Sequence, residues 1–266
     1  MAKKDFKRHD GRKWNETRKI TAKAGVIPQA DGSAVFKIGN STAYAAVYGP
    51  QELHPRFMQD PKKGLLRCHY NMLPYSGPGG RGRPGPNRRA KEISMVTENA
   101  LSPVVDLTAF PNSVIDVHIE FTETDAGSRC AGICAASIAL ADAGITMKDM
   151  VSSVAVGHLD GQVVIDLDGH EEHFDGEVAD IPIAVIPSTG EITLLQMDGM
   201  TDPKLIVEAI EKGKQEIESI AKVQRQAISD RFPNKMTGFA EAKKQLQSIK
   251  KKLAKKKKAA SKEEEQ

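Results

Sequence analysis

Short stretches of alternating apolar and polar residues recur along the chain, which is the pattern of half-buried β-strands. Before residue 75 these stretches are separated by turns rich in Gly, Asn and Asp, and they predict an antiparallel sheet. The expected strands cover residues 24–29, 33–39, 41–49 and 65–73. A longer alternation over 112–125 predicts a further strand.

The second half repeats the pattern of paired strands. A hairpin is predicted across Asp160-Gly161, between strands over 151–159 and 162–168. Strands over 180–187 and 191–198 then flank a turn at 188–190.

Three helices complete the pattern. The first is predicted from Arg88 to about residue 105, with Asn87 as its N-cap, and the last covers 203–231. The second, over 127–144, carries Ala, Gly, Cys and Ser almost all round. Such a helix can approach a sheet and other helices closely, so we expect it to be central.

Paired strands followed by a helix occur twice, which predicts an α/β (α+β) fold with duplicated sheet-and-helix halves packed into one domain. We predict this domain over 19–235, after a basic N-terminal arm at 1–18. The Lys-rich tail at 236–266 has too little apolar content for a core, and we expect it to be mobile.

The composition is that of a globular protein, with 266 residues, 39% of them hydrophobic and 27% charged. No apolar run approaches the roughly 18 residues of a membrane helix, and the first residues lack the apolar stretch of a signal peptide. We therefore expect a cytoplasmic protein with no membrane partner. Cys68, Cys130 and Cys134 form neither a disulfide framework nor a metal knuckle, and free, buried, inert thiols are expected.

Positive charge is concentrated in parts of the chain. The segment 56–91 holds nine Lys and Arg against the single acid Asp60, and the first 23 residues and 243–258 are also basic. This distribution favours a polyanionic partner, because Lys and Arg near phosphates gain Coulomb energy and release counterions. A solvated charged surface is the alternative for any one of these runs.

Two predicted helix starts are suited to bind phosphate. Gly127-Ser128-Arg129 follows a strand directly, where unsatisfied N–H groups, a hydroxyl and a guanidinium can receive an anion. Arg88-Arg89 lies on another first turn, where cations oppose the helix dipole unless an anion binds. The alternative is that Asp125 or Ser128 only caps its helix and Arg129 lies on the surface.

In its sequence motifs the chain resembles the RNase PH family over roughly residues 8–230. The resemblance is carried by motifs in the family's order: RHDGR at 8–12, ADGSA at 30–34, YGPQELHPR at 48–56, NRRAKEIS at 87–94, TDAGSRCAGICAASIALADAG at 124–144, VAVGHLDGQVVIDLD at 154–168 and GEVADIPIAVIPS at 176–188.

The resemblance implies a 3'-to-5' exoribonuclease in which inorganic phosphate attacks the last phosphodiester of RNA and releases a nucleoside diphosphate. The reverse reaction adds RNA tails. The family's site for phosphate and the RNA 3' end falls on Arg89, with Arg88 beside it, and on Gly127, Ser128 and Arg129. Its RNA-guiding loop falls on His54 and Arg56.

The resemblance also implies acidic residues near the leaving 3' oxygen, one of them a general acid whose pKa must be raised above the usual value of about 4. Asp180 fits the second family aspartate. An apparent insertion makes the first uncertain, with Asp175 preferred and Glu172 as the alternative. Mg²⁺ bound by Asp175 and Asp180 is the other role for such a pair. The histidines of His170-Glu171-Glu172-His173 are three apart, unlike those of a zinc protease motif, and we exclude zinc hydrolysis.

Within the family the chain is most similar to active-site-bearing exosome ring subunits. The implied partners are the single-stranded 3' end of RNA, a related inactive subunit in a hexameric ring, and RNA-binding cap proteins. Two alternatives stay open: a non-catalytic RNA-binding scaffold subunit of the ring, and a stand-alone enzyme that trims tRNA.

Overall fold

The computed structural model describes residues 8–77 and 87–233. The elements below belong to one compact unit, Met1–Ile228, except for the last three residues of the final helix. The predicted tail and most of the Gly/Pro/Arg-rich loop at 76–87 lie outside the described residues. Within the described part no helix is both long enough and apolar enough to cross a membrane.

The first sheet has five strands. In spatial order they are β1 (Ile20–Ala24), β2 (Gly32–Ile38), β3 (Ser41–Glu52), β5 (Ser113–Glu123) and β4 (Leu65–Met72). All neighbours are antiparallel except β4 and β5, which run parallel from Leu65 and Val114 onward. The prediction of a wholly antiparallel sheet is wrong for β4, because α1 (Arg88–Leu101) lies between β4 and β5 in sequence and carries the chain back across the sheet.

The predicted strand over 24–29 is also wrong. The first strand ends at Ala24, and the chain leaves the sheet at Gly25, whose φ of 69° lies in the left-handed region. Pro28, which has no N–H to donate, follows within the turn. The sequence ITAKA at 20–24 forms the strand instead.

The second sheet also has five strands. They are β6 (Ser152–Leu159), β7 (Gln162–Ile165), β8 (Val178–Val185), β9 (Ile192–Leu195) and β10 (Asp198–Gly199). The order is β10-β8-β6-β7, with β9 also paired to β8, and every pairing is antiparallel. The hairpin across Asp160-Gly161 is confirmed.

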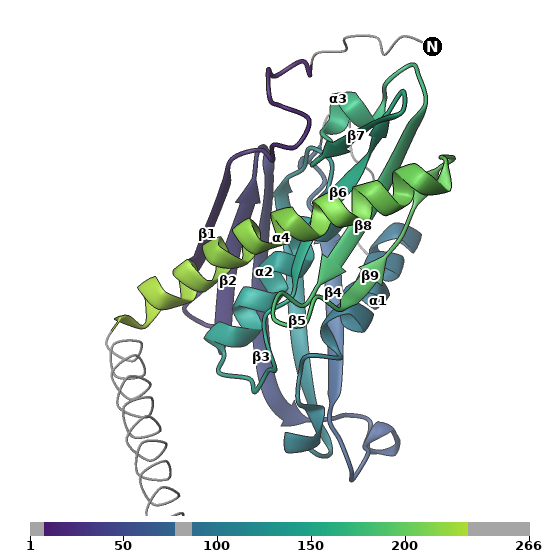
Figure 1. Ribbon diagram of the computed structural model, residues 1–266. Coiled ribbons are helices and arrows are strands. Elements are labelled where there is room, and N and C mark those ends of the chain that lie inside the picture. Colours follow the sequence, from purple (N-terminus) through teal and green to yellow (C-terminus); the bar gives the residue numbers. More distant parts are fainter. Residues whose placement is uncertain (1–7, 78–86, 234–266) are drawn as a thin grey trace, which may run out of the picture. The chain divides into compact units, whose positions relative to one another are not determined.

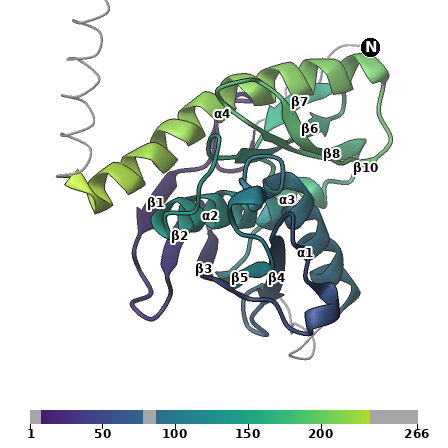
Figure 2. The same ribbon diagram turned by 90° about the horizontal axis from the view of Figure 1, so that it is seen from below.

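The small-residue helix is central, as predicted. This helix, α2 (Ser128–Asp142), packs between the sheets and contacts strands of both (Figure 1, Figure 2). At Gly132 an added Cβ would already touch the side chains of Ile119 and Phe121 at 3.4 and 3.5 Å. The small side chains of α2 let both sheets pack close to this one helix. The arrangement confirms the mixed fold of two sheet-and-helix halves in one domain.

The longest helix covers the outer face of the second sheet. This helix, α4 (Pro203–Arg231), has the predicted bounds and lies over the strands of that sheet (Figure 2). Its Gly213 lies against side chains of Val156 and Ile183. The first long helix begins as predicted, since the Asn87 side chain accepts a hydrogen bond from the Ala90 N–H at 2.7 Å. It ends at Leu101 rather than near 105, because Pro103 cannot donate to the helical ladder.

Three short helices complete the unit: η1 (Arg56–Met58), η2 (Leu107–Ala109) and α3 (Gly169–Glu172). Sequence patterning did not predict α3, which is a single turn. It begins with a capping box, in which Asp168 accepts from the N–H groups of His170 and Glu171 while Glu171 accepts from the N–H of Asp168.

Candidate active site

No side chain caps the start of α2. Its N-cap, Gly127, has φ 62° and offers no side chain to cap the helix. The alternative that Asp125 or Ser128 caps this helix is therefore wrong. The carboxyl of Asp125 instead accepts hydrogen bonds from the Gly169 N–H at 3.0 Å and from the Asn40 amide at 3.2 Å. N–H groups at such a start carry partial positive charge and suit a phosphate.

Ser128 is buried and its hydroxyl is oriented. The hydroxyl oxygen accepts a hydrogen bond from the Tyr70 hydroxyl at 2.9 Å. Since that bond uses an oxygen lone pair, the Ser128 proton is left to donate elsewhere, and Ser128 lines a cavity.

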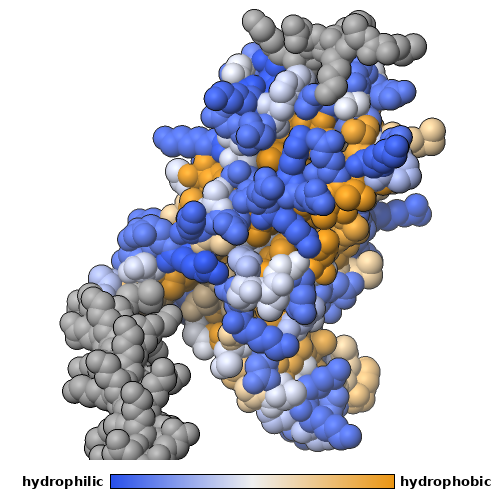
Figure 3. Space-filling view, in the orientation of Figure 1, coloured by the Kyte–Doolittle hydropathy of each residue, from blue (hydrophilic) through white to orange (hydrophobic). Residues whose placement is uncertain are grey.

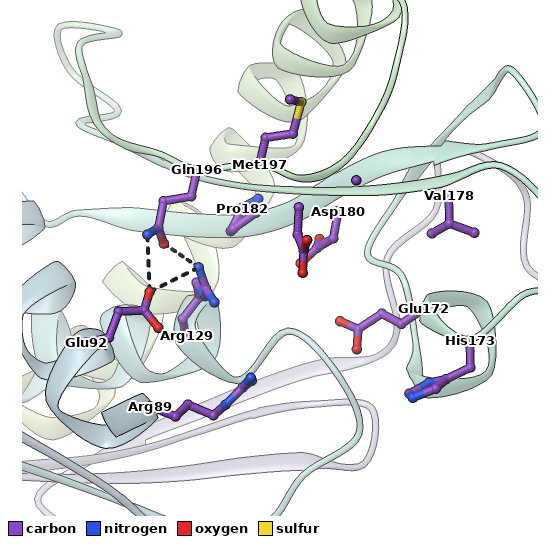
Figure 4. A pocket seen from close by; sticks show the side chains of 12 residues that line it. Arg89, Glu92, Arg129, Glu172, His173, Val178, Asp180, Pro182, Gln196 and Met197 are labelled. Carbon is purple, nitrogen blue, oxygen red and sulfur yellow. Dashed lines mark hydrogen bonds and ion pairs between the residues drawn. The ribbon is translucent and has the colours of Figure 1, made fainter. Parts of the chain in front are cut away.

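Arg129 is held on the wall of a neighbouring cavity rather than on the open surface. Its guanidinium donates to the Gln196 side chain and lies 3.8 Å from a carboxylate oxygen of Glu92. The Gln196 amide in turn donates to Glu92 at 3.3 Å (Figure 4). Residues from α2, α1 and the segment after β9 thus fix the direction of one cation.

Arg89 projects from the first turn of α1 and lines both cavities. Arg88 is exposed and lines neither. The structure therefore brings Arg89, Gly127, Ser128 and Arg129 together, and leaves Arg88 beside the site.

Two adjoining cavities share Arg89, Glu172 and His173. The smaller, of about 320 Å³, is lined by the segment 124–128 and by α3. The larger, of about 570 Å³, has polar walls formed by Arg89, Glu92, Arg129, Glu172, His173, Asp180, Gln196 and Asp198 (Figure 4).

Asp180 on β8 is the most perturbed acid of the larger cavity. Burial first, and the nearby charge of Glu172 second, raise its pKa to about 7, although Arg129 opposes both effects. Its Oδ1 is sealed from solvent and has no hydrogen-bond partner. A carboxyl with this pKa is protonated for part of the time near neutral pH and can give up a proton.

Of the two acids considered beside Asp180, Glu172 lines the larger cavity and Asp175 does not. Glu172 comes from the last turn of α3 and points into the cavity, whereas Asp175 is exposed and lines neither cavity. Burial raises the pKa of Glu172, and Arg89 and a hydrogen bond from the Gly127 backbone lower it. The structure therefore places Glu172, rather than the preferred Asp175, in the cavity, and sequence spacing could not reveal that the short helix α3 ends at Glu172.

The predicted RNA-guiding residues lie at the other end of the first sheet. His54 and Arg56 are exposed, near Glu52 at 3.8 and 3.7 Å, and line neither cavity. They precede β4, which runs parallel to β5 toward the cavities over eight residues. At about 3.3 Å per residue, roughly 25 Å separates this loop from the site.

Sequence reasoning missed four polar residues of the larger cavity: Glu92, His173, Gln196 and Asp198. Glu92 is one helical turn from Arg89, a spacing that could have identified it. Asp198 lies opposite Asp180 in the pairing of β10 with β8, which no sequence spacing reveals. The three cysteines are free and buried, and burial raises the pKa of the Cys134 thiol to about 12, so the prediction of inert thiols stands.

These features define an enzyme of phosphate-ester chemistry: an anion cradle at a helix start, two arginines and a pair of carboxyls, one with a pKa near neutrality. The 3' exoribonuclease family matches the chain through its domain 1 over residues 16–146 and its domain 2 over residues 149–216. The chain belongs to this family.

Relatives match nearly the whole length. The exosome complex component Rrp41 of Methanopyrus kandleri is 45% identical over 232 residues, covering 87% of this chain and 96% of that protein. The Rrp41 protein of Archaeoglobus fulgidus is 46% identical over 231 residues, covering 86% and 88%.

Solved structures agree on the fold. The crystal structure of rice (Oryza sativa) Rrp46 matches with a TM-score of 0.73 and 24% identity, over 82% of this chain and 98% of that chain. The Archaeoglobus fulgidus exosome with RNA bound to its active site matches with a TM-score of 0.69 and 22% identity, over 82% and 92%.

Proposed function

We propose that the chain is the catalytic ring subunit of an archaeal-type exosome, a 3'-to-5' exoribonuclease that uses inorganic phosphate to release nucleoside diphosphates from RNA. The observation that carries this proposal is the position of Asp180, with a pKa of about 7, in a cavity that also holds Arg89 and Arg129 beside the open start of α2. The identity to Rrp41 proteins supports the exosome assignment.

The attacking phosphate is held by the cradle. The Ser128 hydroxyl and the N–H groups that begin α2 bind its oxygens, and Arg89 and Arg129 neutralise the charge of phosphate and scissile phosphodiester together. Holding two anionic groups in reacting distance removes most of the entropic and electrostatic barrier.

Asp180 supplies the proton. A phosphate oxygen forms a bond to the phosphorus of the last phosphodiester, the bond from that phosphorus to the 3' oxygen of the preceding nucleotide breaks, and the Asp180 proton passes to this oxygen. The terminal nucleoside leaves with two phosphoryl groups. The attacking group is phosphate and not water, so the reaction is a reversible nucleotidyl transfer and no hydrolysis.

The carboxyl pair also fits Mg²⁺. Asp180 and Glu172 line the same cavity, and a pair of carboxylates with phosphate oxygens is a donor set that Mg²⁺ accepts. As the alternative to proton donation, Asp180 and Glu172 would both be ionised and would hold the ion, which would neutralise charge on the phosphoryl oxygens. Asp175, exposed outside the cavity, is no longer our proposed ligand.

RNA and a ring partner are part of the proposal. His54 and Arg56, roughly 25 Å from the cavity, are suited to guide the strand upstream of its 3' end, and Arg88 lies beside the cavity. A related, inactive subunit in a hexameric ring and RNA-binding cap proteins complete the assembly. The face drawn in Figure 3 carries apolar surface among its hydrophilic residues. Four apolar residues between β9 and the first turns of α4 are 49% to 89% exposed, which supports such a partner: Leu195, Met197, Met200 and Val207.

We place the chain in the cytoplasm, which its three free cysteines support. The stand-alone tRNA-trimming enzyme and the non-catalytic scaffold are the competing functions. The perturbed acid pair disfavours the scaffold, since a carboxyl with a sealed oxygen that accepts no hydrogen bond costs stability, and strongly perturbed acids cluster at functional sites.

Turnover of labelled RNA by the purified full-length chain separates these functions. The chain is incubated with phosphate, alone and together with its ring partner. We expect degradation to be strongest in the mixed ring. Activity of the chain alone at the full rate favours the stand-alone enzyme, and RNA binding without turnover in either assembly favours the scaffold.

A further inference from the structure

The N-terminal segment 8–18 is bound tightly into the catalytic unit, although its sequence predicts a basic arm. Arg8 and Arg18 are only 3% and 8% exposed. A buried arginine is stable only when its donors are satisfied, so the partners of these two residues reveal what the segment holds.

Arg8 grips α3. It binds Glu171 through two parallel hydrogen bonds of 2.7 and 2.8 Å, and both side chains are almost fully buried. Its remaining donors reach the backbone oxygens of Lys13, Glu16, Ile165 and Asp166 at 2.8 to 3.2 Å. The planar fork of arginine, which lysine lacks, fits this set of acceptors.

Glu171 immediately precedes Glu172. A single helical turn has almost no stability of its own, so the position of α3 depends on the bonds at its start. These are the capping box of Asp168 and Glu171 and the hydrogen bond from the Gly169 N–H to Asp125. Arg8 anchors the capping glutamate, and the direction of Glu172 into the cavity follows from that anchor.

Arg18 connects the N-terminal segment to the loop that precedes α2 and its phosphate-binding start. It binds Asp166 with three hydrogen bonds of 2.7 to 2.8 Å, and it donates to the backbone oxygen of Asp125, two residues before Gly127. The N-terminal segment thus connects the loop that begins α2 with the turn that carries Glu172.

Three residues at the contact between the N-terminal segment and α3 resemble a metal site but do not suit a metal ion. His9, Asp168 and Glu171 have ligand atoms within 4.8 Å of one another. The two carboxylates are already neutralised by Arg12 at 3.3 Å and Arg8 at 2.7 Å, so they have no charge left to attract a cation. The cluster is built to hold protein elements together.

We propose that Arg8 is a positioning residue for catalysis, which acts through Glu171 to hold Glu172 against Asp180 in the active-site cavity. This inference rests on the proposed function. It assigns the RHDGR segment at 8–12 a role in the chemistry, although Arg8 touches no substrate.

A double-mutant cycle tests the proposal. Full-length Arg8→Lys, Glu172→Gln and the double variant are assayed for RNA phosphorolysis in the ring, with Arg225→Lys as control. Arg225 also binds a carboxylate, that of Asp149 at 3.4 Å, and lines neither cavity. We expect Arg8→Lys to lower kcat by roughly 10- to 100-fold with KM for phosphate unchanged, because the cradle itself is intact.

In the double variant we expect kcat close to that of Glu172→Gln alone, because Arg8 acts through Glu172. Losses that multiply, or an Arg8→Lys enzyme as active as the control, overturn the proposal. So does full activity of Glu172→Gln, since Arg8 would then have no catalytic group to position.

Hydrogen exchange separates this inference from the proposed function. In Arg8→Lys the amides of 169–172 are expected to exchange faster than in the wild type, whether or not RNA is degraded. Unchanged exchange overturns the positioning role. If Arg8→Lys does not fold, Glu171→Gln, which can keep the capping bond but weakens the ion pair, is measured in its place with the same expected results.

Discussion

Glu172 and Asp180 reach the same cavity from opposite walls, one from the last turn of α3 and the other from β8, and the charge of Glu172 raises the pKa of Asp180. Arg89 and Arg129 lower the Asp180 pKa and only partly compensate. This pairing gives the Asp180 carboxyl a proton to donate near neutral pH, beside the phosphate cradle.

Replacement of Asp180 tests its role as the proton donor. Asp180→Asn should lower kcat by roughly 10²- to 10⁴-fold, because the amide cannot protonate the leaving oxygen. RNA binding should be nearly unchanged when measured by filter binding or fluorescence anisotropy. Asp175→Asn is the matched control, an identical change in an exposed neighbour of the cavity, and it should keep wild-type turnover. If the control loses activity and Asp180→Asn does not, Asp175 is the acid after all.

The pH dependence of turnover tests the influence of Glu172 on Asp180. The protonated form of Asp180 is lost as the pH rises through its pKa of about 7, so kcat should fall on the alkaline side. Glu172→Gln removes a negative neighbour and lowers the Asp180 pKa, which moves the alkaline limb of kcat to lower pH. An alkaline limb at the same pH in both enzymes would mean that another group donates the proton.

The raised pKa of Asp180 should also make the stability of the folded protein depend on pH. The Asp180 pKa is raised from 3.8 in the unfolded chain to about 7 in the folded chain. The folded state therefore loses stability as the pH rises above about 4, and the loss is complete above about 7, at a few kcal/mol at most. Asp180→Asn should raise Tm at pH values above 7, with a difference that vanishes toward pH 4. Equal Tm differences at all pH values would contradict a raised pKa.

Gly127 tests the phosphate cradle. An alanine there would be strained at φ 62°, with its Cβ 3.4 Å from the Arg18 guanidinium. Gly144 stands just beyond the other end of α2 at φ 72° with open space around it, so Gly144→Ala carries the same backbone strain without touching the cradle. Both variants should lose about 1–2 kcal/mol of stability. Only Gly127→Ala should raise KM for phosphate, by roughly tenfold or more. Equal KM values in both variants would remove the cradle from phosphate binding.

Much of the fold was predictable because its elements are locally determined. The alternation of β5, the small residues of α2 and the cap at Asn87 are each written in a few consecutive residues. The parallel pairing of β4 was not predictable, because it depends on the path of the chain through α1.

The candidate site divides in the same way. Arg89 and the segment 127–129 were predicted because helix starts can be recognised in sequence. Glu172 was only the alternative to Asp175, since a one-turn helix has too few residues for a periodic signal. The burial of Arg8 among residues more than 150 positions away could not be predicted from an exposed-looking basic stretch.

The central claim is phosphorolysis, and the identity of the released nucleotide tests it most directly. The full-length chain, in the ring with its partner, is incubated with RNA labelled at its 3' end and increasing inorganic phosphate, and the products are separated by chromatography. We predict nucleoside diphosphates, formed at a rate that rises with phosphate and is absent without it. Nucleoside monophosphates released without phosphate would contradict the account.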